Sequence, residues 1–177
     1  MRPIAAAAAV ATGALVLGLA GPAHAALYGI DDPQETGRGY DVLALSVNNG
    51  ARNLTVTTQH VDLRRNPRSG TGAAIFVDTD RTDPGPEFVF VGGYFDGTDY
   101  ALLHTEGFAR STWGSPVEDG DYRLRLNYRK DRARVVISQA ALGEPRKVRV
   151  SVRASGNRGP VDWVGKPRSY SLWLTRG

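Results

Sequence analysis

The chain contains no cysteine and only three histidines in 177 residues. The absence of cysteine excludes disulfide bonds, thiol nucleophiles and zinc–thiolate sites. Two histidines, His60 and His104, follow the N-terminal segment, and both lie in predicted strands, where a packed histidine is more common than a catalytic base. No G-x-S-x-G and no H-E-x-x-H motif occurs. The residue patterns that many enzymes use are therefore missing, and we expect a non-catalytic protein.

A glycan-active enzyme is the catalytic alternative that the sequence leaves open. Glycoside hydrolysis uses two carboxyl groups, and the distance between them decides the mechanism. Asp78, Asp96 and Asp99 could supply such a pair, but nothing in the sequence fixes their separation. A binding domain is therefore the better-supported interpretation.

The sequence also lacks a strong excess of one charge. Its formal net charge is +4, and its basic residues form no dense stripe. Proteins that bind nucleic acid specifically usually concentrate Lys and Arg on one face. We therefore expect no specific nucleic-acid partner.

A long apolar run occurs only at the N-terminus. Arg2 precedes the small-residue apolar stretch Ile4–Ala20, and Ala23-His24-Ala25 matches an A-x-A cleavage site. Residues 1–25 are therefore predicted to be a cleavable signal peptide, and the mature protein is predicted to be secreted without a membrane anchor. Removing these 25 residues from 177 leaves 152, enough for one domain with its own hydrophobic core.

After this segment, the hydrophobic pattern has the period of a strand. Tyr122, Leu124 and Leu126 alternate with Arg123 and Arg125, so one face of the strand is apolar and the other is charged. Similar short segments, separated by turns rich in Gly, Pro and Asn, give eight or nine strands and no convincing helix. This pattern predicts an all-β fold, an antiparallel, jelly-roll-like β-sandwich, with a single domain over 41–177. Residues 26–40 are polar and glycine-containing, and we expect them to form a flexible N-terminal arm.

The densest group of acidic residues follows an apolar strand at residues 73–79. Asp78, Asp80 and Asp83 lie around a tight turn that contains two prolines and a glycine. Calcium binds several oxygen ligands, so these three aspartates are a candidate calcium site. The pattern does not match an EF-hand loop. The alternative is that the carboxylates only solvate and cap the turn.

Four aromatic residues fall in or beside predicted loops. Carbohydrate-binding sites combine aromatic platforms with a few polar groups on a rigid scaffold. We therefore consider a site for an extracellular glycan or cell-wall polymer, made by Tyr94, Phe95, Trp113 and Trp163. The alternative is that these side chains close the open ends of the core.

Arginines occupy outward positions on three predicted strands. If those strands were neighbours, the side chains would form one basic sheet face that could bind an anionic wall polymer or a protein partner. The alternative is an ordinary solvated face. The residues are Arg123, Arg125, Arg129, Arg134, Arg149 and Arg153.

One stretch resembles the DOMON-like domains and the family 9 carbohydrate-binding modules. The resemblance rests on an apolar strand that ends in Asp78-Thr79-Asp80, on the turn Pro84-Gly85-Pro86, and on the strand Glu87–Val91; Val61-Asp62-Leu63 fits the preceding strand. It covers residues 41–105. It implies a β-sandwich that binds sugar, with bound calcium in some members, and it assigns no sugar-stacking residue of this chain.

Overall fold

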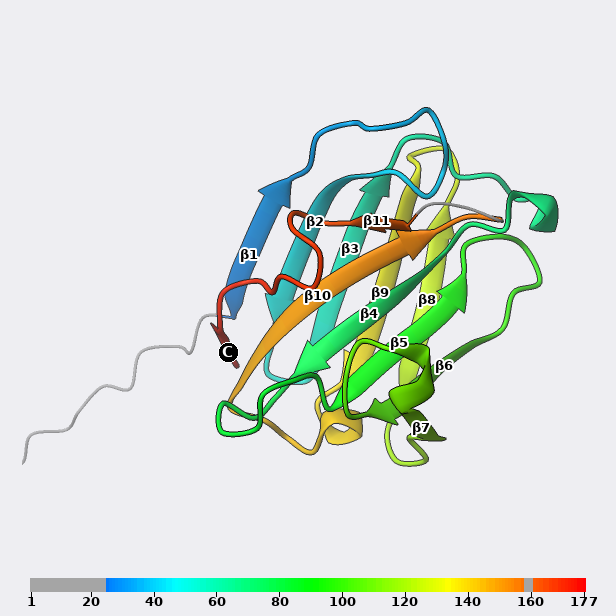
Figure 1. Ribbon diagram of the computed structural model, residues 1–177. Coiled ribbons are helices and arrows are strands. Elements are labelled where there is room, and N and C mark those ends of the chain that lie inside the picture. Colours follow the sequence, from blue (N-terminus) through cyan, green and yellow to red (C-terminus); the bar gives the residue numbers. More distant parts are fainter. Residues whose placement is uncertain (1–24, 158–160) are drawn as a thin grey trace, which may run out of the picture.

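The computed structural model describes residues 25–157 and 161–177, so almost all of the predicted signal peptide, residues 1–24, lies outside the described residues (Figure 1). The described chain consists of strands and three short 3-10 helices. None of its helices is long and apolar enough to cross a membrane.

The strands form two antiparallel sheets. The five-stranded sheet has the order β1, β2, β3, β9, β8, and its strands are β1 Ala26–Asp31, β2 Val42–Asn49, β3 Asn53–His60, β9 Arg132–Ser138 and β8 Tyr122–Asn127. In Figure 1 this sheet lies behind the strands of the second sheet, which cross in front of it.

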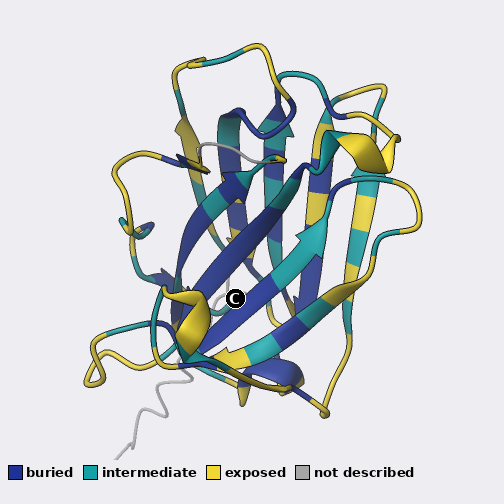
Figure 2. Cartoon of the chain, turned by 45° about the vertical axis from the view of Figure 1, so that its right-hand side comes forward, coloured by how far each residue is buried: buried dark blue, intermediate teal, exposed yellow. Residues whose placement is uncertain are grey.

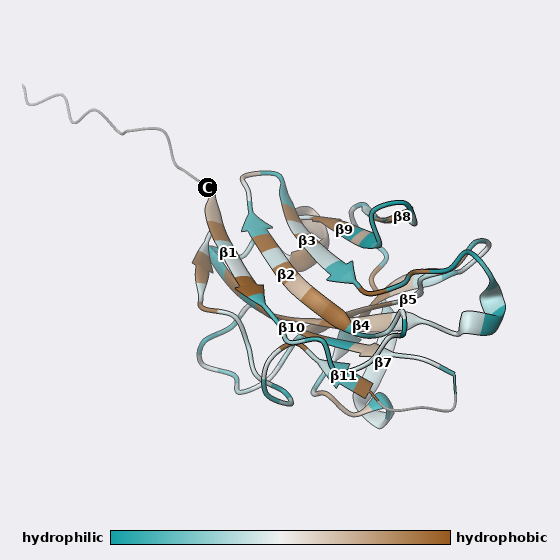
Figure 3. Cartoon of the chain, turned by 90° about the horizontal axis from the view of Figure 1, so that it is seen from above, coloured by the Kyte–Doolittle hydropathy of each residue, from teal (hydrophilic) through white to brown (hydrophobic). Residues whose placement is uncertain are grey.

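The seven-stranded sheet has the order β11, β10, β4, β5, β6, β7, and β12 pairs with β10. Its strands are β4 Gly72–Asp78, β5 Phe88–Gly93, β6 Tyr100–Thr105, β7 Trp113–Pro116, β10 Lys147–Ser155, β11 Val161–Trp163 and β12 Leu174–Thr175. The 3-10 helices are η1 Pro67–Ser69, η2 Arg110–Thr112 and η3 Ala140–Leu142. Seen from above, the two sheets form two layers (Figure 3).

The main core lies between the sheets because alternate side chains of each strand point inward. Val47 and Val56 from the five-stranded sheet join Ile75, Phe90 and Val150 from the seven-stranded sheet in one buried cluster. On β8 the inward residues are half-buried and the intervening arginines are exposed (Figure 2). The predicted all-β class is confirmed.

The seven-stranded sheet is also apolar on its outer side. On β4, Ala74 and Phe76 point away from the main core, yet they are buried with Val89 in a second, smaller cluster. Two segments cover this outer face: the β6–β7 connection contributes Phe108, and the segment after β11 lies along β10. This second cluster explains why every residue of β4 after Gly72 is buried.

The predicted flexible arm is partly wrong, because it contains a strand. The whole of β1 pairs with β2, from Ala26 opposite Asn49 to Asp31 opposite Ala44. Its backbone groups complete the edge of β2, and Ala26 and Tyr28 pack against the core. The polar composition of this segment is that of an edge strand with one solvent-facing side.

Candidate functional site

A row of arginines and aromatic rings runs along the outer face of the seven-stranded sheet. We call it the arginine–aromatic ladder. Each member lies within 6.0 Å of the next, measured between ring centres or from a guanidinium carbon to a ring centre. In order, the members are Arg81, Trp173, Arg149, Tyr170, Phe108, Trp163, Arg153, Trp113 and Arg110.

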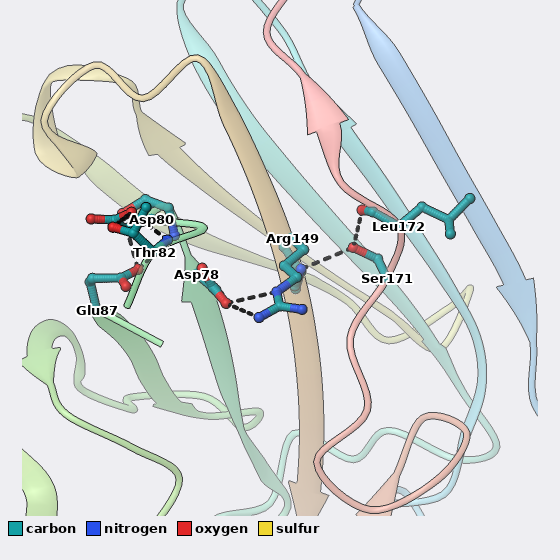
Figure 4. Close-up of polar contacts among 9 residues, drawn as sticks. Asp78, Asp80, Thr82, Glu87, Arg149, Ser171 and Leu172 are labelled. Atoms are coloured by element: carbon teal, nitrogen blue, oxygen red, sulfur yellow. Dashed lines mark hydrogen bonds and ion pairs between the residues drawn. The ribbon is translucent and has the colours of Figure 1, made fainter. Parts of the chain in front are cut away.

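One arginine of the ladder, Arg149, forms an ion pair with Asp78. The Arg149 guanidinium donates through Nε to Asp78 Oδ2 at 2.7 Å, and its Nη2 lies 2.5 Å from the same oxygen (Figure 4). The Asp78 side chain is fully buried, and the Arg149 side chain is 29% exposed. Burial raises the pKa of Asp78, and the bond from Arg149 opposes that shift. Because the Asp78 carboxylate is fully buried and bound to Arg149, we interpret this pair as structural.

The other acidic residues of the turn are each held locally. Asp80 Oδ1 accepts from the backbone N–H and the hydroxyl of Thr82, and Glu87 Oε2 accepts from the backbone N–H of Thr79 at 2.6 Å (Figure 4). Asp83 is exposed. Among the residues that the structure describes, no three His, Cys, Asp or Glu side chains are grouped as a metal site. The arrangement of Asp78, Asp80 and Asp83 thus supports the turn-capping interpretation and does not support a preformed calcium site.

A groove of about 460 Å³ lies beside the other end of the ladder. Its floor is made of small outward residues on three adjacent strands, among them Gly72, Ala74 and Ala101. A side chain at position 72 would not fit, because its Cβ would lie 2.7 Å from the carbonyl oxygen of Gly92. The floor therefore carries no side chain at position 72, whereas the large Trp113 side chain forms a wall of the groove.

The groove is lined by charged and polar residues of several kinds. Arg110 and Arg153 lie with Trp113, 5.7 Å and 6.0 Å from the centre of its ring, and Asp99 and Ser155 also line the groove. The groove therefore combines an aromatic ring, two cations, a carboxylate and a hydroxyl above a small-residue floor.

Arg153 is a half-buried cation beside the indole of Trp113. It forms no ion pair with any residue in the described ranges. Burial lowers its pKa, and the positive charge of Arg110 lowers it further. Its guanidinium is held by the rings of Phe76, Trp113 and Trp163, each within 6.0 Å.

The structure separates the four predicted aromatic residues. Trp113 and Trp163 both belong to the ladder, and Trp113 lines the groove. Phe95 packs over Gly93, where a Cβ would lie 2.5 Å from its ring. The prediction for Tyr94 is wrong: its side chain is fully buried and meets His60 edge-on, with ring centres 5.3 Å apart. Tyr94 follows β5 in phase with Phe88 and Phe90, whose side chains also lie in the main core, and its N–H donates to the carbonyl of Thr71.

The predicted single basic face is also wrong. Arg123, Arg125 and Arg134 lie on β8 and β9 of the five-stranded sheet, and Arg129 follows β8 in the turn. Arg149 and Arg153 lie on β10, in the other sheet. Both sides of β9 are already paired, with β3 and β8, so β10 cannot pair with β9, and it pairs with β4 of the other sheet instead.

The carboxylates considered for hydrolysis do not form a pair. Asp78 is bound to Arg149, Asp96 pairs with Arg65 at 3.2 Å, and Asp99 lines the groove. No two of these carboxylates share a site, so the geometry gives no support to a glycoside hydrolase.

Sequence reasoning missed much of the ladder. The missed members lie outside the strands: Phe108, Tyr170, Trp173 and Arg81 are in loops or in the segment before β12, and Arg110 begins the short helix η2. One signal was present: the apolar residues on both faces of β4 indicated that something must cover its outer side. That pattern does not say which loops do so.

A separate polar cluster lies where β2 and β11 begin. It contains His60 and Asp162, whose pKa values are shifted in opposite directions. Burial lowers the pKa of His60 to about 4, whereas burial raises the pKa of Asp162 to about 6. Asp162 Oδ2 accepts the Val42 N–H at 2.7 Å, and His60 Nε2 lies 2.8 Å from the hydroxyl of Thr58. Both groups are at most 5% exposed.

We predict opposite pH profiles for two variants of this cluster. The folded state binds the His60 proton more weakly than the unfolded state, so His60 costs stability as the pH falls from 6.5 to 4. Asp162 holds its proton more tightly in the folded state, so it adds stability as the pH falls from 6 to 3.8. Relative to wild type, His60→Gln should gain up to about 3 kcal/mol between pH 7 and pH 4, and Asp162→Asn should lose a similar amount. Urea unfolding across this range is the measurement, and parallel profiles for the three proteins would contradict the assignment.

Comparisons of this chain with protein-family models, with curated proteins and with solved structures found no match.

Proposed function

We propose that this chain is an exported, non-catalytic β-sandwich domain that binds extracellular carbohydrate in the groove beside Trp113. The observation that carries this proposal is the groove itself, in which an indole ring stands beside polar groups over a small-residue floor. Sugars present apolar ring faces and hydroxyl groups, so an aromatic wall with hydrogen-bonding neighbours matches both. Its volume of about 460 Å³ lies in the usual range for ligand pockets.

The scaffold supports a displayed site of this kind. The groove floor lies on β4, β5 and β6, and β4 and β5 are each paired on both sides, so most of the floor is held within a continuous sheet. Trp113 lies at the start of edge strand β7, where Thr105 of β6 is opposite. The site thus has a fixed floor and a wall supplied by a loop-bounded strand, which is a common arrangement for binding residues.

Filling the groove tests the proposal without removing any packing. Ala101 is a half-buried floor residue on β6. In Ala101→Tyr the new ring should occupy the groove, and tyrosine is favourable in strands. We expect binding to a panel of neutral and acidic oligosaccharides, measured by calorimetry, with affinity at least tenfold lower in Ala101→Tyr.

The matched control is Thr55→Tyr, which adds the same ring to the outer side of the five-stranded sheet. It should bind the panel like wild type, and both variants should melt within a few degrees of wild type. Unchanged binding by Ala101→Tyr would exclude the groove. If no oligosaccharide binds to the wild type, the proposal fails, and the exposed arginines of β8 and β9 become the surface to test with protein partners.

A further inference from the structure

The two arginines of the groove differ from Arg149, although all three stack on aromatic rings of one sheet face. Arg149 has the carboxylate of Asp78 at 2.5 Å, whereas Arg153 and Arg110 form no ion pair with any described residue. The charge of Arg149 is therefore neutralised by Asp78, whereas Arg110 and Arg153 lie beside the indole of Trp113 without an ion-pair partner among the described residues.

Leaving these two cations together costs free energy in the empty protein. Like charges repel, and Arg153 is also partly removed from water by the rings around it. An anion placed between the two guanidinium groups would remove the repulsion and supply the missing hydrogen-bond acceptors. Arginine suits this role because its planar group donates two parallel bonds to a carboxylate, sulfate or phosphate.

We infer that the sugar bound in this groove carries an anionic substituent, which contacts Arg110 and Arg153 while the sugar ring lies against Trp113. This inference rests on the proposed glycan-binding function and specifies its ligand class. Asp99 lines the same groove and would repel the anionic group, so the substituent lies toward the two arginines and the neutral hydroxyls lie toward Asp99. The shared chemistry is an oxyanion on a saccharide, with carboxylate, sulfate or phosphate as its sources.

The experiment compares charged saccharides with their own uncharged counterparts. Oligogalacturonate is paired with its methyl ester, a sulfated galactan oligosaccharide with its desulfated form, and mannose 6-phosphate with mannose. Calorimetry with the mature protein should give at least tenfold tighter binding for the charged member of one pair. This preference should weaken as salt is raised from 50 to 300 mM, because the contacts are partly exposed.

Two variants and a control assign the effect to the groove. Arg153→Gln and Arg110→Gln should each reduce the charged-over-neutral preference at least fivefold. Arg110 is exposed, so its variant should fold like wild type even if Arg153→Gln does not. Arg125→Gln removes the same charge from the opposite sheet, and it should leave the preference unchanged.

The outcomes separate this inference from the proposed function. If glycans bind and Ala101→Tyr blocks them, but charged and neutral members bind equally, the groove is a glycan site and the anionic inference is overturned. Equal loss of the preference in Arg125→Gln would also overturn it, because net charge would then be the cause. If no charged or neutral saccharide binds, both the inference and the proposed function fail.

Discussion

Arg149→Met is expected to lower the free energy of unfolding by about 3–5 kcal/mol, because it leaves a buried carboxylate without its partner. Asp78 is fully buried, and its Oδ2 accepts from Arg149 at 2.7 Å. The substitution also removes the cation that stacks on Tyr170 and Trp173. Urea unfolding at pH 7 measures the loss. The control is Arg125→Met, at an exposed position of β8, which should change stability by no more than about 0.5 kcal/mol.

A double-mutant cycle and a pH series identify the cause of that loss. Asp78→Asn combined with Arg149→Met removes both charges, so the double variant should be more stable than the sum of the two single losses predicts. Burial already raises the pKa of Asp78, and removing Arg149 raises it further. The loss in Arg149→Met should therefore shrink as the pH falls toward 4, since the lone carboxyl can then be protonated. A loss equal to that of Arg125→Met would contradict the buried-pair assignment.

Tyr94→Ala is expected to lower the free energy of unfolding by about 3–5 kcal/mol, which is the usual cost of removing a large buried ring. Tyr94 is the largest of the fully buried side chains, and it packs edge-on against His60. Tyr94→Phe keeps the ring and removes only the buried hydroxyl, which lies near Thr58, so stability should change by about 1 kcal/mol or less.

The same pair of variants distinguishes a core residue from a binding residue. Tyr94→Phe should bind saccharides with wild-type affinity, because Tyr94 does not line the groove. Weaker binding at unchanged stability would assign Tyr94 to the site after all. Thermal melting and calorimetry on one preparation supply both quantities.

The strands were predictable from sequence, whereas their arrangement was not. Alternation identified β8 and β10, because apolar inward residues alternate with polar outward residues along both strands. Alternation carries no information about the partner of a strand, so the step from β9 to β10 between sheets could not be foreseen. β1 was missed because a short edge strand with a glycine has a weak pattern.

The candidate site was predictable only in part. Trp113 was identified as a candidate because large aromatic residues in loops are common in binding sites. Arg153 was assigned to a basic face, whereas its role depends on Trp113 and Trp163, which reach it from β7 and β11. The groove floor was not foreseen, since small residues on three strands are brought together only by the pairing of β4, β5 and β6.

The composition of the ladder has a spectroscopic consequence. The chain has three tryptophans, and all three, Trp113, Trp163 and Trp173, belong to the ladder. Indole emission therefore reports on the outer face of the seven-stranded sheet and does not report on the core between the two sheets. A fluorescence melting curve follows the detachment of the β6–β7 connection and the C-terminal segment, whereas far-UV circular dichroism follows the sheets. A difference between the two midpoints would measure how independently this covered face opens.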